Sequence, residues 1–81
     1  MRIIYTRHAR QRMSQRKVSE KQVEETLLEP DEIEPGDNGG DIAIRRYGTR
    51  QVQVVYNEVE KETYLIYTVI RPRIQKRPGR K

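Results

Sequence analysis

The residues with the clearest chemical potential lie in one short stretch near the amino terminus, between His8 and Arg16. Side chains four positions apart lie on the same face of a helix. His8 and Arg12 have this spacing and Arg16 can extend the stripe, while Ala9 and Met13 form an apolar stripe beside it. A helix here would pack a small apolar edge on a core and present an imidazole and guanidinium groups along its margin.

These residue types suit metal-free cleavage of RNA, which needs a base, an acid and positive charge for the phosphate oxygens. His8 is the candidate acid or base, and Arg12 is a candidate phosphate ligand because guanidinium groups bind phosphate in a bidentate way. A tyrosine could stack on a base or support proton transfer; the candidates are Tyr47, Tyr56, Tyr64 and Tyr67, of which Tyr67 is placed in the catalytic group with His8 and Arg12. The arginines expected to contact nucleic acid are Arg7, Arg12, Arg16, Arg45, Arg71 and Arg73.

Each of these residues also has a purely structural interpretation. A lone histidine at the start of a helix is often a packing or capping residue. Arg12 and Arg16 can instead bind the acidic segment that follows or the carbonyl ends of neighbouring elements, and Tyr67 can lie at the edge of the core. With only one histidine in the chain, a mechanism that uses two is excluded, so any catalysis would need Arg, Lys, Tyr or Glu beside it.

The charged residues are segregated along the chain, whose net charge is +5. Residues 1–17 carry six basic groups and no acid, and residues 63–81 carry another six basic groups and no acid. Residues 18–34 carry seven acids and one lysine. Such segregation suits a basic surface that binds a phosphate backbone. The alternative is ordinary solubility, with an acidic helix that offsets a basic one.

The composition excludes several kinds of site. The chain has no cysteine and one histidine, which excludes disulfides and thiolate metal sites and argues against a histidine metal cage. We therefore expect no metal and no cofactor. No apolar run approaches the roughly 20 residues of a membrane span, and the start of the chain lacks a signal-peptide pattern. The expected partners do not include a membrane, and the expected location is the cytoplasm.

Two helices are expected in the first third of the chain. Thr6 is a suitable N-cap for a helix over residues 7–16. Ser19 and Gln22 have the spacing of a capping box for a second helix, which must end before Pro30 because proline cannot continue it.

Strands and turns are expected in most of the folded chain outside the helices. The predicted strands are residues 2–5, 41–47, 51–56 and 63–70, Ile33 is either a brief edge strand or a plug on the core, and the predicted turns are 36–40, 48–49 and 57–62. In the strand 41–47, alternation places Ile42 and Ile44 toward the helices and Ala43, Arg45 and Tyr47 on the other face.

These elements predict an α+β fold in which two N-terminal helices pack on one face of a three- to four-stranded antiparallel sheet. We expect one domain over residues 1–71, followed by a basic and disordered tail over residues 72–81. A domain of this size buries only about 60% of its unfolded surface. A homodimer or another partner that covers the second face of the sheet, or one edge, would therefore add stability.

Four features follow one another along the chain. They are the pattern Thr6-x-His8-Ala9-x-x-Arg12-Met13-x-x-Arg16, a serine-capped acidic helix, a hairpin, and a final strand with Tyr67-Thr68-Val69. This order resembles a small prokaryotic domain family of unknown function with the signature HAxxRMxxR. The layout is similar to that of RelE/ParE-like toxins, including the BrnT type, over roughly residues 3–71. The resemblance implies a RelE-like fold. RelE-like members cleave messenger RNA on the ribosome and ParE-like members act on DNA gyrase, so the fold does not fix the activity.

The leading hypothesis is a RelE/ParE-like domain that binds RNA or the ribosome, with a metal-independent endoribonuclease activity as its enzymatic form. The alternative is a non-enzymatic module that binds nucleic acid or protein. A positively charged surface could also meet an acidic, antitoxin-like protein.

Overall fold

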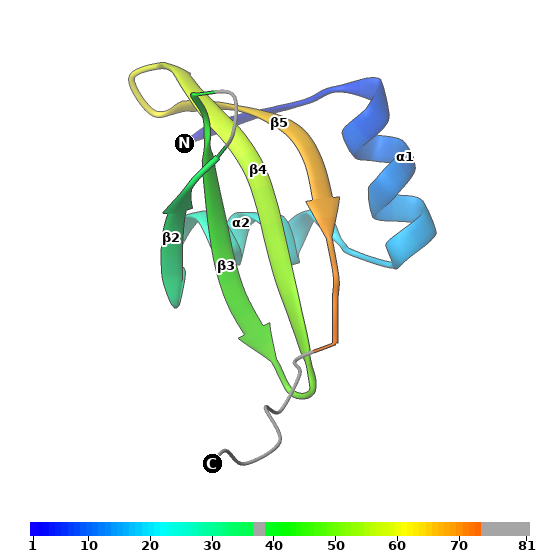
Figure 1. The fold of residues 1–81 in the computed structure, drawn as a ribbon. Coiled ribbons are helices and arrows are strands. Elements are labelled where there is room, and N and C mark those ends of the chain that lie inside the picture. The colour runs from blue at the N-terminus through cyan, green and yellow to red at the C-terminus, as the bar shows by residue number, and fades with distance from the viewer. Residues whose placement is uncertain (37–38, 74–81) are drawn as a thin grey trace.

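The computed structural model describes residues 1–36 and 39–73, which form one five-stranded sheet with two helices on one face (Figure 1). The elements in chain order are β1 (Arg2–Tyr5), α1 (Arg7–Arg16), α2 (Glu20–Leu28), β2 (Glu32–Pro35), β3 (Asp41–Tyr47), β4 (Arg50–Glu60) and β5 (Thr63–Ile70).

The sheet is mixed, with the strand order β1-β5-β4-β3-β2. Strands β2 to β5 pair antiparallel with their neighbours, whereas β1 pairs parallel with β5, with Ile3 opposite Tyr64. The prediction of a three- to four-stranded antiparallel, RelE-like sheet is therefore wrong. The local pattern revealed the strand character of residues 2–5, but it contained no information on the direction or the partner of a strand that pairs with the far end of the chain.

Both predicted helices are confirmed, together with their caps. The Thr6 hydroxyl accepts a hydrogen bond from the Ala9 backbone N–H at 2.9 Å. Helix α1 ends at Lys17, which adopts a left-handed conformation with φ of 57°. Ser19 and Gln22 form the predicted capping box at the start of α2. These contacts satisfy N–H groups that the first turn of a helix leaves without intrahelical partners.

The core lies between the helices and one face of the sheet. Its buried apolar members are Ala9, Met13, Val18, Val23, Ala43, Val52, Val54, Tyr56, Ile66 and Val69. The face predicted for β3 is wrong, because Ala43 faces the helices and Ile42 lies on the opposite face with Val55 and Thr68. Alternation alone cannot say which of two sets faces the core, and here the small Ala43 side chain leaves room for α2.

Strand β4 is longer than its pattern predicted. It continues to Glu60, so the predicted turn over residues 57–62 is confined to its last part. Glu62 has a positive φ of 59°, and its N–H donates to the Glu58 carboxylate at 3.0 Å. The predicted strand 63–70 and the turn at Gly48, where φ is +64°, are confirmed.

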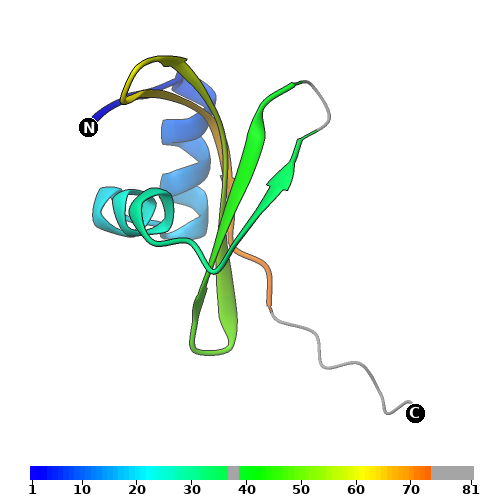
Figure 2. The same ribbon diagram turned by 90° about the vertical axis from the view of Figure 1, so that its left-hand side faces the viewer.

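Helix α1 covers the edge of β5 beyond the point where β1 ends, and α2 lies across the back of the sheet (Figures 1 and 2). The Thr6 hydroxyl donates to the Tyr67 carbonyl at 3.2 Å, and Nη1 of Arg16 donates to the Val69 carbonyl at 3.4 Å. These two side chains thereby form hydrogen bonds to the part of the β5 edge that β1 leaves unpaired. The start of α1 is held beside β5 at Tyr67.

Two predicted segments lie partly outside the described residues. The predicted turn over 36–40 includes residues 37–38, and the predicted tail includes residues 74–81. At its start, the Pro72 carbonyl accepts a hydrogen bond from the Gln51 N–H at 3.0 Å, and Arg73 forms an isolated bridge with Arg50. Of the helices formed by the described residues, none has the length and apolar content needed to span a membrane.

Candidate functional site

A hollow of about 570 Å³ lies on the face of the sheet that the helices do not cover. Its lining comes from the start of α1, from the turn that joins β2 to β3, and from the strands β3, β4 and β5. The lining residues are His8, Gly36, Gly40, Ile42, Val55, Tyr67, Thr68 and Ile70. Hollows of 300–1,000 Å³ with an apolar lining and a few polar groups are the usual form of a small-ligand site.

His8 lies at the polar end of this hollow, and Arg12 contacts it from the next turn of α1. His8 is exposed in the first turn of α1, and Nε of Arg12 lies 3.4 Å from its Nε2 atom. Nη1 of Arg12 donates to the Gln15 side chain at 2.8 Å. The guanidinium is thereby held beside the imidazole, as the four-residue spacing predicted.

Tyr67 and Thr68 both reach the hollow because strand β5 is irregular beside them. The pairing of β4 with β5 shifts between Val55 and Tyr56, so Val55 pairs with Thr68 and Tyr56 pairs with Ile66. Tyr67 is the extra residue, and it is 40% exposed. The hydrogen bond from Thr6 to its carbonyl fixes the backbone there. The structure therefore brings His8, Arg12 and Tyr67 together, the three residues predicted as a catalytic group.

Gly40 allows the turn after β2 to approach β4 and form a wall of the hollow. A Cβ at Gly40 would lie 2.6 Å from the Tyr56 carbonyl oxygen, closer than real Cβ contacts allow. The turn itself is closed by a hydrogen bond of 2.8 Å from the Gly36 N–H to the Gly40 carbonyl. Glycine is needed where a backbone approaches another backbone this closely.

The hollow has a distinct chemical character. Its floor is aliphatic, formed by Ile42, Val55 and Ile70, and no carboxylate is among its lining residues in the described part of the chain. The side chains of Tyr67 and His8 add aromatic surface at one side. Such a site can hold a flat, uncharged ring on its floor while an attached anion lies against the Arg12 guanidinium.

Several predicted nucleic-acid contacts lie elsewhere. Arg7 is exposed on α1, and Arg73 is exposed beyond the end of β5. Arg16 and Arg71 are half-buried and bond to backbone carbonyls, since Nη1 of Arg71 donates to the Arg16 carbonyl at 3.4 Å. The bond from the Arg16 guanidinium to the Val69 carbonyl matches the structural alternative for Arg16. Arg45 lies on the helix-covered face, away from the hollow.

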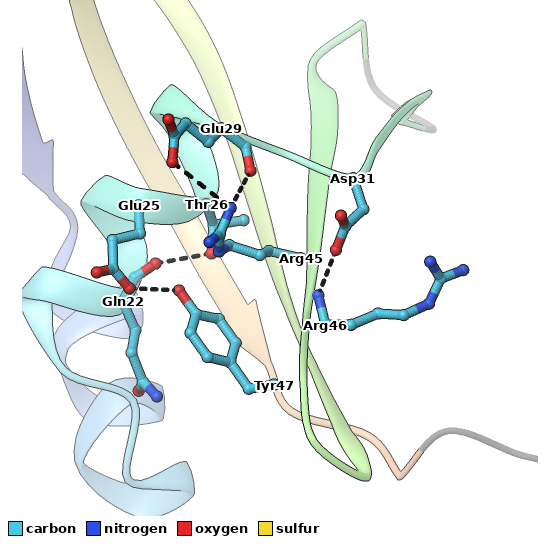
Figure 3. A network of polar contacts seen from close by, with 8 residues as sticks. All are labelled: Gln22, Glu25, Thr26, Glu29, Asp31, Arg45, Arg46 and Tyr47. Atoms are coloured by element: carbon cyan, nitrogen blue, oxygen red, sulfur yellow. Dashed lines mark hydrogen bonds and ion pairs between the residues drawn. The ribbon is translucent and has the colours of Figure 1, made fainter.

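Arg45 belongs to a polar network between α2 and β3 (Figure 3). Its Nη1 donates to the Glu29 carbonyl at 2.6 Å and lies 3.9 Å from the Glu29 carboxylate. The Tyr47 hydroxyl donates to the Glu25 carboxylate at 2.7 Å. Burial raises the pKa of Tyr47, and the hydrogen bond to Glu25 raises it further. These contacts hold the last turn of α2 against the sheet. Arg45 therefore stabilises the fold and does not line the hollow.

The sequence did not identify most of the hollow's aliphatic and glycine residues. Ile42 was assigned to the opposite face, and the Gly36–Gly40 segment was interpreted only as a turn. The irregular pairing that brings Tyr67 and Thr68 to one place has no signal in the alternation of residues 63–70. Within residues 1–36 and 39–73, no group of three or more His, Cys, Asp or Glu side chains is placed to hold a metal ion.

Comparisons with curated proteins and with solved structures give no match. A match to a family is found over residues 5–71, from the end of β1 to just beyond β5. The family is described as a domain of unknown function, DUF4258. Nothing in the comparisons relates the chain to RelE/ParE-like or BrnT-type toxins. The matched range contains α1, β5 and the whole hollow between them, and the chain therefore belongs to the DUF4258 family.

Proposed function

We propose that this domain binds single-stranded RNA in the cytoplasm, with one unpaired nucleotide in the hollow. The observation that supports this most directly is an aliphatic and aromatic hollow lined by His8, whose imidazole is in contact with the Arg12 guanidinium. RNA-binding proteins commonly hold unstacked bases on aromatic side chains and bind the attached phosphate with basic groups.

The proposed orientation follows from the chemistry of the lining. The base lies over Ile42, Val55 and Ile70 and stacks on the Tyr67 ring, because these side chains offer apolar surface without carboxylates. The phosphate lies against Arg12, whose guanidinium contacts His8 and donates to Gln15. A double helix cannot place a base there without unpairing it, so the proposal favours single strands or loops.

The enzymatic form of this proposal is a metal-independent endoribonuclease, as in toxins of the RelE-like kind. It is supported by the position of His8, an imidazole beside a guanidinium and near the Tyr67 side chain. His8 would move a proton to or from the ribose hydroxyl or the leaving oxygen, and Arg12 would stabilise the phosphorane charge. Tyr67 would support the base. An acidic, antitoxin-like protein is the partner that this form of the proposal implies.

Titration of a labelled uridine decanucleotide with the purified protein tests RNA binding. Tyr67→Ala should weaken binding about tenfold, because loss of one base–aromatic stack costs ~1–3 kcal/mol. Arg12→Ala should weaken binding and reduce its salt dependence. Val59→Ala and Lys61→Ala are the matched controls, since they remove an exposed apolar group and a charge outside the hollow. If Tyr67→Ala and Val59→Ala bind alike, the hollow is not the binding site.

A separate test addresses cleavage. Induction in a bacterial host should arrest growth, and the His8→Ala, Arg12→Ala double variant should not. RNA incubated with ribosomes and protein should be cut only by the unmodified chain. Absence of both growth arrest and cleavage would reject the enzyme and leave the binding module.

A further inference from the structure

Strand β1 places one apolar side chain outside the core. Ile3 and Tyr5 pack against the core under the helices, so the alternation of the strand directs Ile4 to the face that the helices do not cover, here called the open face. Ile4 is 42% exposed there. It is paired with the half-buried Leu65 on β5, and Leu65 is paired with Asn57 on β4. These three side chains form a row across three strands, which we call the Ile4–Asn57 row.

The Ile4–Asn57 row adjoins the hollow in two places. Gly40, which lines the hollow, lies so close to β4 that a Cβ built on it would be 4.0 Å from the Asn57 Cβ. Tyr67, which also lines the hollow, follows Leu65 by two residues on β5, about 7 Å at the rise of an extended strand. The apolar surface of the open face therefore extends from the hollow toward β1.

None of the three side chains of the row carries a charge. The adjacent carboxylates Asp41 and Glu58 lie on the helix-covered face, because each is paired across the sheet with a tyrosine that packs on the core. Burial raises the pKa of one of them, Tyr56, and these two carboxylates raise it further. The Asn57 side chain is half-buried and offers both a hydrogen-bond donor and an acceptor. The row thus presents aliphatic surface with one amide at the end beside the hollow.

We propose that the Ile4–Asn57 row holds the base of a second nucleotide, adjacent in the same RNA strand to the nucleotide whose base occupies the hollow. This inference rests on the proposed function and makes the site one for two successive unpaired nucleotides. The second base lies over Ile4 and Leu65, and its edge forms hydrogen bonds with the Asn57 amide. RNA-binding domains that use an open sheet commonly hold two or three bases side by side on neighbouring strands.

Two properties of the row determine how the second base should act. The short step from Leu65 to Tyr67 suits the next nucleotide of an extended strand, so no nucleotide between the two bases has to loop out. Because the row is uncharged, the second base should add affinity without adding to the salt dependence, which arises from phosphate contacts. A phosphate bound at the row would instead make the salt slope steeper.

The experiment compares a uridine dinucleotide with two matched dinucleotides that lack the base on one or the other ribose. All three carry the same phosphate, and each competes with the labelled uridine decanucleotide for the purified protein. We expect the complete dinucleotide to bind about fivefold more tightly than either abasic form, since one more ring is removed from water over aliphatic side chains. The three salt slopes should be equal. If the complete and abasic dinucleotides bind alike, the row holds no base.

Ile4→Thr is the central variant, because threonine suits a strand and Ile4 lies outside the core, so the melting temperature should stay close to that of the unmodified protein. The variant should weaken binding of the complete dinucleotide and leave both abasic forms unchanged. Asn57→Ala should give the same pattern. Val59→Thr is the matched control, since Val59 is also β-branched, is 47% exposed and lies near the far end of β4. Equal effects of Ile4→Thr and Val59→Thr would overturn the inference.

Further outcomes separate this inference from the proposed function. If Tyr67→Ala weakens all three dinucleotides while loss of one base changes nothing, the hollow binds one nucleotide and the second site is wrong. If neither the dinucleotides nor the decanucleotide bind, both proposals fail. If the protein sediments as a dimer without RNA and Ile4→Thr makes it a monomer, the row is an interface between two copies of the chain, and the inference is overturned.

Discussion

The α2–β3 contact and the α1–β5 contact use arginine in different ways. At the first, Arg45 binds both the carbonyl and the carboxylate of Glu29 (Figure 3). Between β3 and β2, Arg46 lies 3.6 Å from the Glu32 carboxylate. At the second, Arg16 and Arg71 bond only to backbone carbonyls, and Arg12 faces His8. Within residues 1–36 and 39–73, no carboxylate forms an ion pair with Arg12, Arg16 or Arg71, whereas Arg45 and Arg46 each have a glutamate partner.

This difference shows how the same residue type can serve structure in one place and leave charge for a ligand in another. A guanidinium bound to a carboxylate and a helix carbonyl has most of its donors satisfied and gains little from a phosphate. A guanidinium bound by one long hydrogen bond to a carbonyl keeps donors and full charge available. Arginine variants on the α2–β3 side should therefore change stability, and Arg12 variants on the α1–β5 side should change binding.

The largest effect on stability is expected for Arg45→Ala. The variant leaves the Glu29 carbonyl at the end of α2 without its 2.6 Å partner and removes the guanidinium that lies over the Tyr47 ring at 5.6 Å. Hydrogen bonds to charged groups contribute ~1.5–3 kcal/mol, and the free energy of unfolding should fall by this amount. Urea denaturation measures it. An equal loss of RNA affinity at a temperature where the variant is folded would contradict the division between the two sides.

Thr6→Ala should have the next largest effect, because it removes the N-cap of α1 and the bond to the Tyr67 carbonyl together. Loss of a cap costs ~0.5–2 kcal/mol. Thr6→Ser keeps the hydroxyl and should restore most of the stability in a thermal melt. If Thr6→Ser is as unstable as Thr6→Ala, the loss of stability comes from the threonine methyl group and not from the two hydrogen bonds of the hydroxyl.

Tyr47→Phe should cost ~0.5–1.5 kcal/mol at neutral pH, the usual contribution of one hydrogen bond. Burial and Glu25 raise the pKa of Tyr47, so the unfolded chain loses this proton at a lower pH than the folded protein does. The stabilisation is complete below about pH 10 and is lost as the pH rises through the folded value.

Urea titrations between neutral and strongly alkaline pH test this dependence. The unmodified protein should lose stability more steeply than Tyr47→Phe. A residual slope is expected in the variant because burial also raises the pKa values of Tyr5 and Tyr56. Parallel curves for the two proteins would show that Tyr47 does not titrate with folding.

The smallest effect on stability is expected for His8→Ala. His8 is exposed and its contact with Arg12 is long, so the free energy of unfolding should change by no more than about 0.5 kcal/mol. RNA binding or cleavage should nevertheless change. A loss of stability larger than that of Thr6→Ala would mean that the imidazole acts in packing, as the structural alternative holds.

Local features of the fold could be predicted because they depend on neighbours in the chain. Thr6 and Ser19 cap helices through N–H groups three residues ahead, and Pro30 follows α2 because it cannot be part of its interior. The pairing of His8 with Arg12 follows from helix periodicity in the same way. The parallel partner of β1 could not be predicted, since Ile3 and Tyr64 are brought together by long-range strand pairing and not by any local pattern.

The sequence by itself determined the two capped helices, the last strand, the β3–β4 turn and the imidazole–guanidinium stripe of α1. Each depends on interactions within a few residues. The tertiary structure decided that Ala43, and not Ile42, faces the core, that Arg45 meets Glu29, and that Tyr67 lies near His8. These outcomes depend on sheet register and on one irregularity in β5, which are set by the packing of distant elements and leave no local periodicity in the chain.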